Sequence, residues 1–339
     1  MIGRIGHRGQ GTARGALLAA AAGLAAVLVA ACGADGGQAV AKGPGTGATH
    51  PGTAHPPSAR GDGARGTADG PPGGPAVTSG RYVALGDSFT SAPFVSDLGG
   101  LPAGCLRSAK DYPTLVAAAL HIPASAFSDM SCYGASTADM SRPQKVLDQR
   151  TPPQLDALSA ADTLVTLQVG GDDIGVARIA FTCGTLSLAD PFGSPCTRHY
   201  TAGGTDQLAR SVARTGPKVA AVLRAIHRRA PRARVLVVGY PDILPTSGNG
   251  CWPEVPIARG DVPYLRGVET KLDSMLAAEA AANDATFVDT YAPSIGHDAC
   301  RHAGVKWIEG LIPTSLGVPF HPNAAGEQAM AREIVATVR

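Results

Sequence analysis

The chain of 339 residues is 44% hydrophobic and 17% charged, and its 29 Lys and Arg nearly balance its 27 Asp and Glu. Without a basic surplus or a run of Lys and Arg, nothing supplies the phosphate attraction on which nucleic-acid binding mostly rests, so we exclude nucleic acid as a partner. Residues 1–79 contain too few large apolar side chains to build a core. We therefore expect one folded domain, over residues 80–339.

The N-terminal residues 1–31 have the composition of a signal peptide. Basic residues precede an apolar run over residues 16–31, which is mostly Ala and shorter than the roughly 20 residues that span a bilayer. The run ends in Val-Ala-Ala-Cys, similar to a bacterial lipobox, so we predict that Cys32 is lipidated and tethers the protein to the outer face of the cytoplasmic membrane. Two alternatives stay open: plain cleavage at a small-residue site with release of the chain, and a stray cysteine in a leader.

Residues 32–79 consist mainly of Gly, Pro, Ala, Thr and Ser with scattered charge. This composition predicts a disordered spacer rather than a second domain. At roughly 5–6 Å times the square root of its length, such a spacer would hold the folded domain some tens of ångströms from the membrane.

Beyond the spacer, short β-branched runs alternate with longer amphipathic stretches, which is the pattern of parallel strands joined by crossover helices. The run Val-Leu-Val-Val over residues 235–238 is apolar throughout, as expected for a strand buried on both faces. We predict an α/β fold, a three-layer α/β/α sandwich of the flavodoxin-like type with a central parallel sheet. The expected strands cover residues 82–85, 126–131, 163–169, 234–239 and 286–289, and the expected helices cover residues 112–120, 207–229, 262–282 and 324–338.

Six cysteines lie within the predicted domain, and an even number in an exported chain indicates disulfides, for which sequence alone allows 15 pairings. No two of them have the Cys-x-x-Cys spacing that zinc sites favour, so we expect no metal and no cofactor. They are Cys105, Cys132, Cys183, Cys196, Cys251 and Cys300.

In such sheets ligands bind beyond the carboxyl ends of the strands, and polar or glycine-rich blocks follow three of the expected strands. The first strand leads into Gly-Asp-Ser at Ser88, the second into Gly134, and the third into Gly-Gly-Asp-Asp over residues 170–173. The last expected helix is preceded by His321. A Gly-Asp-Ser tripeptide alone is weak evidence, but four blocks in this order and at this spacing are a specific signal.

With these blocks the chain resembles the SGNH hydrolases, also called the GDSL esterase and lipase family, from about Tyr82 to the C-terminus. It is most similar to the secreted actinobacterial esterases and lipases of that family, which carry six cysteines. The resemblance implies hydrolysis of carboxylic esters. It also implies that the cysteines pair in sequence order, as Cys105–Cys132, Cys183–Cys196 and Cys251–Cys300.

In a hydrolase of this kind Ser88 would be the nucleophile and His321 the base that takes its proton, because a serine hydroxyl is a poor nucleophile until it is activated. The tetrahedral intermediate needs donors aimed at its oxyanion, and the backbone N–H groups of Ser88 and Gly134 would supply two. The other histidines of the predicted domain lack a matching block, so we expect them to be solvated or packed.

Two positions depart from the family pattern. Many members have an aspartate three residues before the histidine, where this chain has Val318. We therefore predict a Ser-His dyad in which the backbone carbonyl of Val318 orients the imidazole.

At the second position, the family's oxyanion-hole asparagine is replaced by Asp172, and an ionised carboxylate has no hydrogen to donate. Asp172 could be protonated, turn away, or weaken the enzyme; we expect reduced activity with a raised, pH-sensitive pKa for Asp172.

The leading interpretation is a secreted, membrane-tethered esterase or lipase that acts as a monomer on an acyl ester or lipid. A carbohydrate deacetylase or a phospholipase A is an alternative, because the same dyad serves any acyl oxygen ester. A third interpretation, from another class, is a catalytically weakened surface lipoprotein that binds an acyl or sugar ligand, and Asp172 is the feature that favours it.

Overall fold

The computed structural model of the protein describes residues 80–100, 102–146 and 148–339. The predicted signal peptide (1–31), the predicted lipidation of Cys32 and the predicted spacer (32–79) lie outside these residues. Within the described part, no helix is both long and apolar enough to cross a membrane.

The centre of the domain is a five-stranded sheet whose neighbouring strands all pair in parallel. The strand order is β2-β1-β5-β6-β7, which is the doubly wound order of flavodoxin-like folds. All five predicted strands are present, so the expected fold class is confirmed. They are β1 (Arg81–Gly86), β2 (Phe127–Asp129), β5 (Asp162–Gln168), β6 (Arg234–Val238) and β7 (Thr286–Val288).

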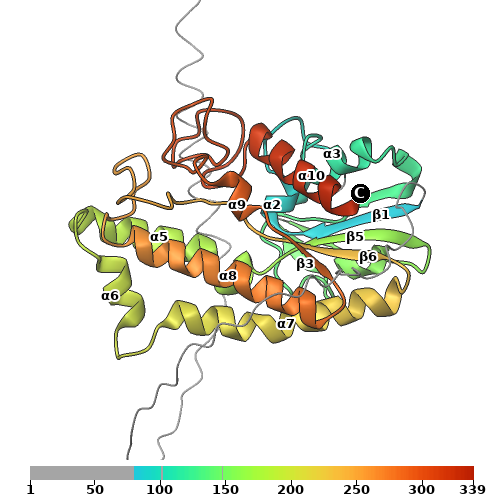
Figure 1. Cartoon of the computed structure of the whole chain (residues 1–339), viewed down its shortest axis with the longest axis horizontal. Coiled ribbons are helices and arrows are strands. Elements are labelled where there is room, and N and C mark those ends of the chain that lie inside the picture. Colours follow the sequence, from blue (N-terminus) through green and yellow to red (C-terminus); the bar gives the residue numbers. More distant parts are fainter. Residues whose placement is uncertain (1–79, 101, 147) are drawn as a thin grey trace, which may run out of the picture. The chain divides into compact units, whose positions relative to one another are not determined.

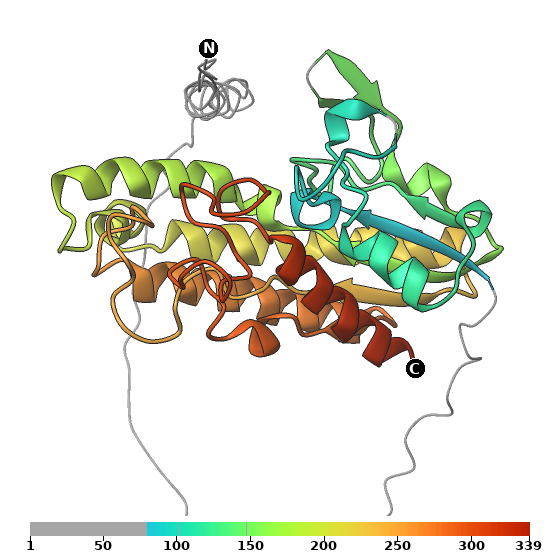
Figure 2. The same cartoon turned by 90° about the horizontal axis from the view of Figure 1, so that it is seen from above.

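Helices cover both faces of the sheet, which gives the predicted three layers (Figure 1). Helices α3 (Tyr112–Ala119) and α10 (Ala324–Val338) pack together on one face. Helices α7 (Gln207–Arg229) and α8 (Val262–Ala282) lie on the other, and the view from above shows α5 (Val176–Ala189) extending past the end of the sheet (Figure 2).

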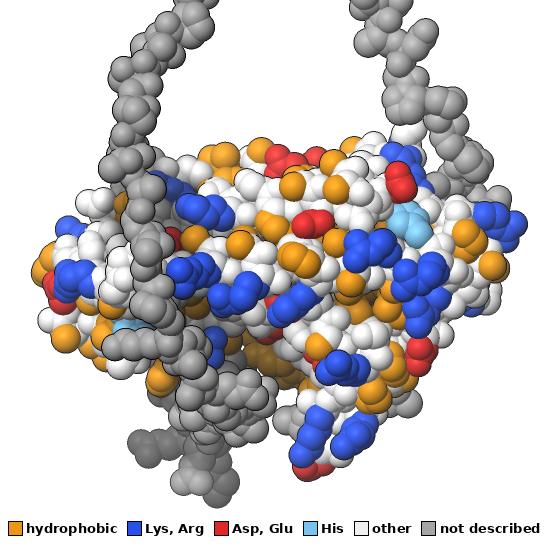
Figure 3. All heavy atoms as spheres, turned by 90° about the horizontal axis from the view of Figure 1, so that it is seen from below, with side chains coloured by type: hydrophobic (Ala, Val, Ile, Leu, Met, Phe, Trp, Pro, Cys, Tyr) orange, Lys and Arg blue, Asp and Glu red, His pale blue; other side chains and the backbone are white. Residues whose placement is uncertain are grey.

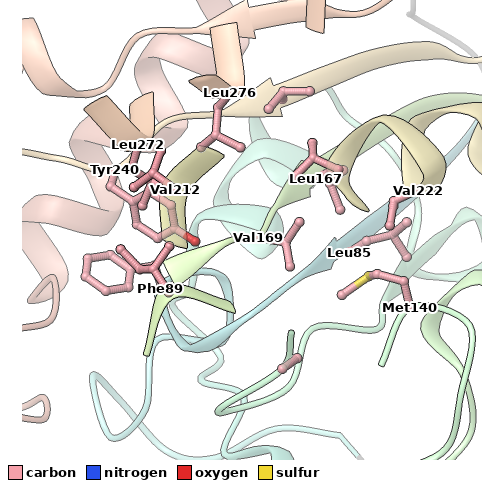
Figure 4. Packing of buried hydrophobic residues seen from close by; sticks show 14 of the residues in the cluster. Leu85, Phe89, Met140, Leu167, Val169, Val212, Val222, Tyr240, Leu272 and Leu276 are labelled. Atoms are coloured by element: carbon pink, nitrogen blue, oxygen red, sulfur yellow. The ribbon is translucent and has the colours of Figure 1, made fainter. Parts of the chain in front are cut away.

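Alternation of side chains along each strand divides the core into two clusters. On β1, Tyr82 faces the cluster beneath α3 and α10, while Leu85 faces the larger cluster beneath α7 and α8. Figure 4 shows part of the larger cluster, in which Phe89 and Tyr240 lie together near the ends of the strands. The packed sheet therefore places aromatic side chains directly beneath the edge where the serine block and the block over residues 170–173 emerge.

Several elements were not predicted from the sequence, because they are short or lack a clear period. They are the hairpin of β3 (Gln144–Val146) and β4 (Gln149–Thr151), helix α5, helix α6 (Pro195–Thr201), and the single-turn helices α2 (Ser88–Ser91), α4 (Gly171–Ile174) and α9 (Tyr291–Ser294). Three of these, α2, α4 and α9, begin within four residues of a strand end, so they turn the chain at the carboxyl edge of the sheet.

The disulfides pair in sequence order, so the predicted connectivity is confirmed. The first bond, Cys105–Cys132, holds the segment after β2 against the loop that precedes α3. The second, Cys183–Cys196, joins α5 to α6. The third, Cys251–Cys300, ties the loop after β6 to the loop after α9.

Candidate active site

The serine block begins where β1 ends, and its geometry depends on Gly86. A Cβ at this position would lie 2.0 Å from Oγ1 of Thr90 and 2.9 Å from the carbonyl oxygen of Gln168, so only glycine fits. Asp87 then caps α2, because its Oδ1 accepts a hydrogen bond from the N–H of Phe89 at 2.9 Å. Ser88 is the first residue of α2, and its backbone N–H belongs to the unpaired donors of a helix N-terminus.

The second block lies beside the first, because the segment after β2 is tied to β1. The N–H of Cys132 donates to the carbonyl oxygen of Gly86 at 3.0 Å, and Cys132 is also disulfide-bonded to Cys105. Gly134 has φ +72, a conformation that L side chains rarely adopt. Within the described residues, its backbone N–H has no hydrogen-bond acceptor.

The third block turns sharply at the end of β5 and starts α4. Gly170 has φ +126, and the next residues, Asp172 and Asp173, lie in the first turn of α4. Asp173 accepts hydrogen bonds from the N–H of Thr137 at 2.8 Å and from its Oγ1 at 2.6 Å, and pairs with Nζ of Lys218 at 3.1 Å. Asp173 therefore anchors α4 to the segment that follows Gly134.

Folding brings the predicted nucleophile and base into direct contact. Nε2 of His321 lies 2.7 Å from Oγ of Ser88, although the two residues are 233 positions apart in the chain. The ring centroids of His321 and Phe89 are 4.7 Å apart, and those of His321 and Tyr133 are 6.4 Å apart. Burial lowers the pKa of His321 to about 4, although the hydrogen bond to Pro319 opposes the shift. The imidazole is therefore neutral at pH 7 and able to accept a proton.

The predicted role of the Val318 carbonyl is wrong, and the carbonyl of the next residue takes its place. Nδ1 of His321 lies 2.8 Å from the carbonyl oxygen of Pro319. The carbonyl oxygen of Val318 accepts the backbone N–H of His321 instead, at 3.3 Å. Phe320, which lies between Pro319 and His321, has φ +61, and this turn brings the imidazole back to the Pro319 carbonyl. A backbone carbonyl does contact Nδ1 of His321, as predicted, but it belongs to Pro319, one residue further along the chain than Val318.

A buried carboxylate, Glu309, organises the loop that carries His321. Its carboxyl oxygens accept hydrogen bonds from Nδ2 of Asn323 at 2.8 Å, from the N–H of Thr314 at 2.7 Å and from Oγ of Ser315 at 2.5 Å. Burial alone would raise the pKa of Glu309, but these hydrogen bonds bring it below the usual value. The backbone of Glu309 also pairs with that of His321 and Phe320. The carboxylate thus closes the loop over residues 310–320.

Tyr240 links the serine block to the third block, and the sequence analysis missed it. Its hydroxyl donates to Oδ2 of Asp87 at 2.5 Å and accepts the N–H of Gly171 at 3.0 Å. Its ring packs edge-on against Phe89, with centroids 5.1 Å apart (Figure 4). Tyr240 lies two residues beyond the end of β6, so the rule that ligand-site residues follow strand ends could have found it.

Carboxyl groups crowd the part of the site formed by the serine block and the third block. Burial, together with the nearby charges of Asp87, Asp173 and Asp139, raises the pKa of Asp172 well above its usual value. Burial likewise raises the pKa of Asp87 to about 7, although the hydrogen bonds from Tyr240 and Phe89 lower it. No group among the described residues hydrogen-bonds to the Asp172 carboxyl. Protonation of Asp172 is therefore favoured relative to an exposed carboxyl group, because the proton relieves repulsion and breaks no hydrogen bond.

A parallel sheet with a serine and a histidine in contact at its carboxyl edge defines the class of SGNH-type α/β hydrolases. Comparison with known proteins agrees: residues 84–329 match the GDSL-like lipase/acylhydrolase family. Lipase 2 of Streptomyces coelicolor is 40% identical over 253 residues, which is 74% of this chain and 83% of that protein.

Two solved structures extend the comparison. Phospholipase A1 of Streptomyces albidoflavus is 29% identical with a TM-score of 0.60, over 76% of this chain and 98% of that one. An extracellular lipase of Streptomyces rimosus is 26% identical with a TM-score of 0.62, over 77% of this chain and 100% of that one. The chain belongs to the GDSL-like lipase/acylhydrolase family and is an ester hydrolase.

Proposed function

We propose that the protein is a secreted esterase or lipase that cleaves acyl esters with a Ser88–His321 dyad. The observation that carries the proposal is the 2.7 Å contact between Nε2 of His321 and Oγ of Ser88. The carbonyl oxygen of Pro319, 2.8 Å from Nδ1, favours the tautomer with its proton on Nδ1. That tautomer leaves Nε2 free to take the serine proton.

The chemistry proceeds in two acyl transfers. Oγ of Ser88 attacks the ester carbonyl carbon while its proton passes to Nε2 of His321. The tetrahedral intermediate collapses, the proton moves to the leaving alcohol oxygen, and an acyl-serine remains. Water then attacks the acyl-serine, gives a proton to the same imidazole, and releases the carboxylic acid as Ser88 regains its proton.

The oxyanion of each intermediate needs hydrogen-bond donors. The N–H groups of Ser88 and Gly134 support this role, because neither has an acceptor among the described residues. We assign the third donor to the protonated form of Asp172, whose pKa is raised by burial and by neighbouring carboxylates. The ionised form would repel the oxyanion, so only the protonated fraction of the enzyme turns over at full rate.

The proposal includes export and attachment to the cell envelope. Three disulfides favour an oxidising compartment, and the S. rimosus relative is an extracellular lipase. Attachment through a lipid on Cys32 rests on the sequence at residues 29–32. Mass spectrometry of the N-terminal peptide from the native envelope tests it: a diacylglyceryl mass on Cys32 is expected, and an unmodified peptide contradicts the anchor.

Labelling by a fluorophosphonate tests the nucleophile directly. We expect the full chain to be modified at Ser88, the Ser88→Ala variant to remain unlabelled, and His321→Ala to label far more slowly. Absence of labelling in the unmodified protein, shown to be folded by circular dichroism, would refute the dyad and favour a ligand-binding lipoprotein.

A panel of substrates then defines the reaction. It should contain p-nitrophenyl esters of increasing acyl length, a phosphatidylcholine and an acetylated sugar, each assayed beside Ser88→Ala. Phospholipase A activity is the second candidate, because the S. albidoflavus relative is named as a phospholipase A1. Cleavage of the acetylated sugar alone would overturn the esterase or lipase assignment in favour of a deacetylase.

A further inference from the structure

Helix α7 carries an unbalanced positive charge that the catalytic site does not use. From Arg81 onward the chain has 23 Lys and Arg against 24 Asp and Glu, so the folded domain is close to neutral. Within its 23 residues, however, α7 has six Lys and Arg and no Asp or Glu. All six side chains are exposed: Arg210, Arg214, Lys218, Arg224, Arg228 and Arg229.

The charges form one stripe, because their spacing follows the helical repeat. At 100° per residue the six positions fall within an arc of about 140°. Figure 3 shows the result as a row of Lys and Arg side chains across the face of the molecule that α7 covers. From Arg210 to Arg228 the stripe is about 27 Å long at 1.5 Å per residue. A straight row of this length matches an extended surface better than a compact anion.

Most of the stripe has no counter-charge within the described part of the chain. Lys218 pairs with Asp173, and Arg224 donates to Oδ1 of Asn283 at 3.3 Å. The side chains of the remaining four arginines form no ion pair or hydrogen bond with another described residue, although Asp284 lines a groove beside Arg228. Like charges four residues apart repel one another and destabilise a helix. An anionic surface would offset this repulsion.

The end of the stripe lies where the N-terminal chain joins the domain. Arg232, just after α7, donates to the carbonyl oxygen of Ala160 at 2.6 Å, and nearby Asp162 pairs with Arg81 at 2.9 Å. Arg81 is the first residue of β1 and therefore follows the segment predicted to lead to the membrane anchor. A membrane partner thus agrees with both the charge and the point of attachment.

We propose that the exposed face of α7 docks on a bilayer rich in anionic phospholipid. Basic residues near such a surface each strengthen binding by about fivefold, and salt weakens the attraction. The docking goes beyond ester hydrolysis and does not require the lipid on Cys32. It would hold the domain flat on its α7 face once the anchor has brought it to the membrane.

Vesicle co-sedimentation tests the proposal with the full chain carrying Cys32→Ser, so that no acyl anchor contributes. We expect binding to vesicles with 30% phosphatidylglycerol in phosphatidylcholine at least about 100-fold tighter than to pure phosphatidylcholine, and loss of this difference in 0.5 M NaCl. Pure phosphatidylcholine measures any binding by the apolar leader. Replacement of Arg214, Arg224 and Arg228 by Gln should weaken the phosphatidylglycerol-dependent binding about 100-fold.

The matched control neutralises three exposed basic residues at the β3–β4 hairpin, Arg142, Lys145 and Arg150, and should change binding by less than threefold. Equal losses in both variants, or no preference for anionic vesicles, would overturn the proposal. Displacement from the vesicles by DNA at equal phosphate concentration would overturn it in favour of nucleic acid. Both variants should hydrolyse a soluble short-chain ester at the unmodified rate, so a failed hydrolase assignment would be seen separately.

Discussion

The candidate active site has a buried carboxyl group on each of two sides, Glu309 near His321 and Asp172 in the third block, and their hydrogen bonding differs. On the histidine side, the charged acceptor Glu309 receives donors from Asn323, Thr314 and Ser315, so its negative charge is fully compensated. On the other side, burial and the nearby charges of Asp87, Asp173 and Asp139 raise the pKa of Asp172. Hydrogen bonds keep the Glu309 carboxylate ionised, whereas burial and neighbouring charges drive Asp172 toward protonation.

The difference shows how a buried carboxyl group takes on a structural or a chemical role. A carboxylate with several donors is locked in one protonation state and holds a loop in place. A buried carboxyl group with charged neighbours and no donor keeps its proton to higher pH than an exposed one, and any step that needs its proton becomes sensitive to pH. The histidine side should therefore set whether the enzyme works, and the Asp172 side how fast it works at a given pH.

The largest expected effect follows from removing the base. His321→Ala should lower kcat by about 10⁴-fold or more, because without an imidazole Ser88 keeps its proton. Steady-state kinetics on a soluble p-nitrophenyl ester measure the loss, with circular dichroism to confirm folding. A loss below tenfold would show that His321 is not the base.

Restoring a permanent donor at Asp172 should raise activity. Asp172→Asn supplies an N–H that does not depend on pH, and one oxyanion donor is typically worth a hundredfold to a thousandfold in rate. We therefore expect kcat at pH 7 to rise, by up to about that factor, because the ionised form of Asp172 cannot donate. Asp172→Ala removes the charge without adding a donor and is the control. An unchanged or lower rate in the Asn variant contradicts this account of the oxyanion site.

The pH profile should separate the two sides. Since burial lowers the pKa of His321 to about 4, activity should persist down to about pH 5, whereas an unperturbed histidine would lose it below about pH 6.5. Activity should decline as pH rises through the raised pKa of Asp172, because the ionised form cannot donate. Measurement of kcat/KM from pH 4 to 9 tests both limbs, and Asp172→Asn should lack the upper one. Identical upper limbs in the two proteins would exclude Asp172 as their cause.

A smaller effect is expected at Tyr240. Tyr240→Phe removes the donor to Asp87 and the acceptor for the N–H of Gly171, so kcat should fall by roughly tenfold as the third block loosens. Without that hydrogen bond Asp87 holds its proton more tightly and repels Asp172 less. The upper limb of the pH profile should therefore move to lower pH, which a purely structural role would not cause. The control is Tyr264→Phe, which removes a half-buried hydroxyl that donates to Oδ1 of Asp206 away from the site.

The smallest effect on chemistry is expected at Glu309, where the effect on stability should dominate. Glu309→Gln loses charge-assisted hydrogen bonds and should lower the free energy of unfolding by about 1–3 kcal/mol at pH 7. Because the folded-state pKa of Glu309 is depressed, its contribution is present above about pH 4.5 and is lost as pH falls through the folded value. Urea unfolding at pH 7 and at pH 4 checks this. An equal difference at both pH values would rule out the ionised carboxylate as the source.

Much of the fold could be predicted because strands and helices follow from the local pattern of apolar and polar residues. Apolar runs such as residues 235–238 have to be buried on both faces, and that requirement predicted the parallel sheet and its strands. The blocks at Ser88 and His321 could be predicted because they follow strand ends or precede a helix, where the topology brings them to one edge. Short elements such as α4 and the β3–β4 hairpin carry too few residues for a periodic signal, so they were missed.

The residue pattern alone was enough to predict the five strands of the sheet, the cysteine pairing through a family resemblance, and the position of Ser88 and His321 at one edge of the sheet. Two contacts could be known from the folded chain alone: the carbonyl oxygen of Pro319, rather than that of Val318, contacts the imidazole, and Tyr240 joins Asp87 to Gly171. Strand patterns depend on burial, which is repeated along the chain. A single hydrogen bond depends on the angle of one turn, such as the positive φ of Phe320, and on contacts between residues more than a hundred positions apart.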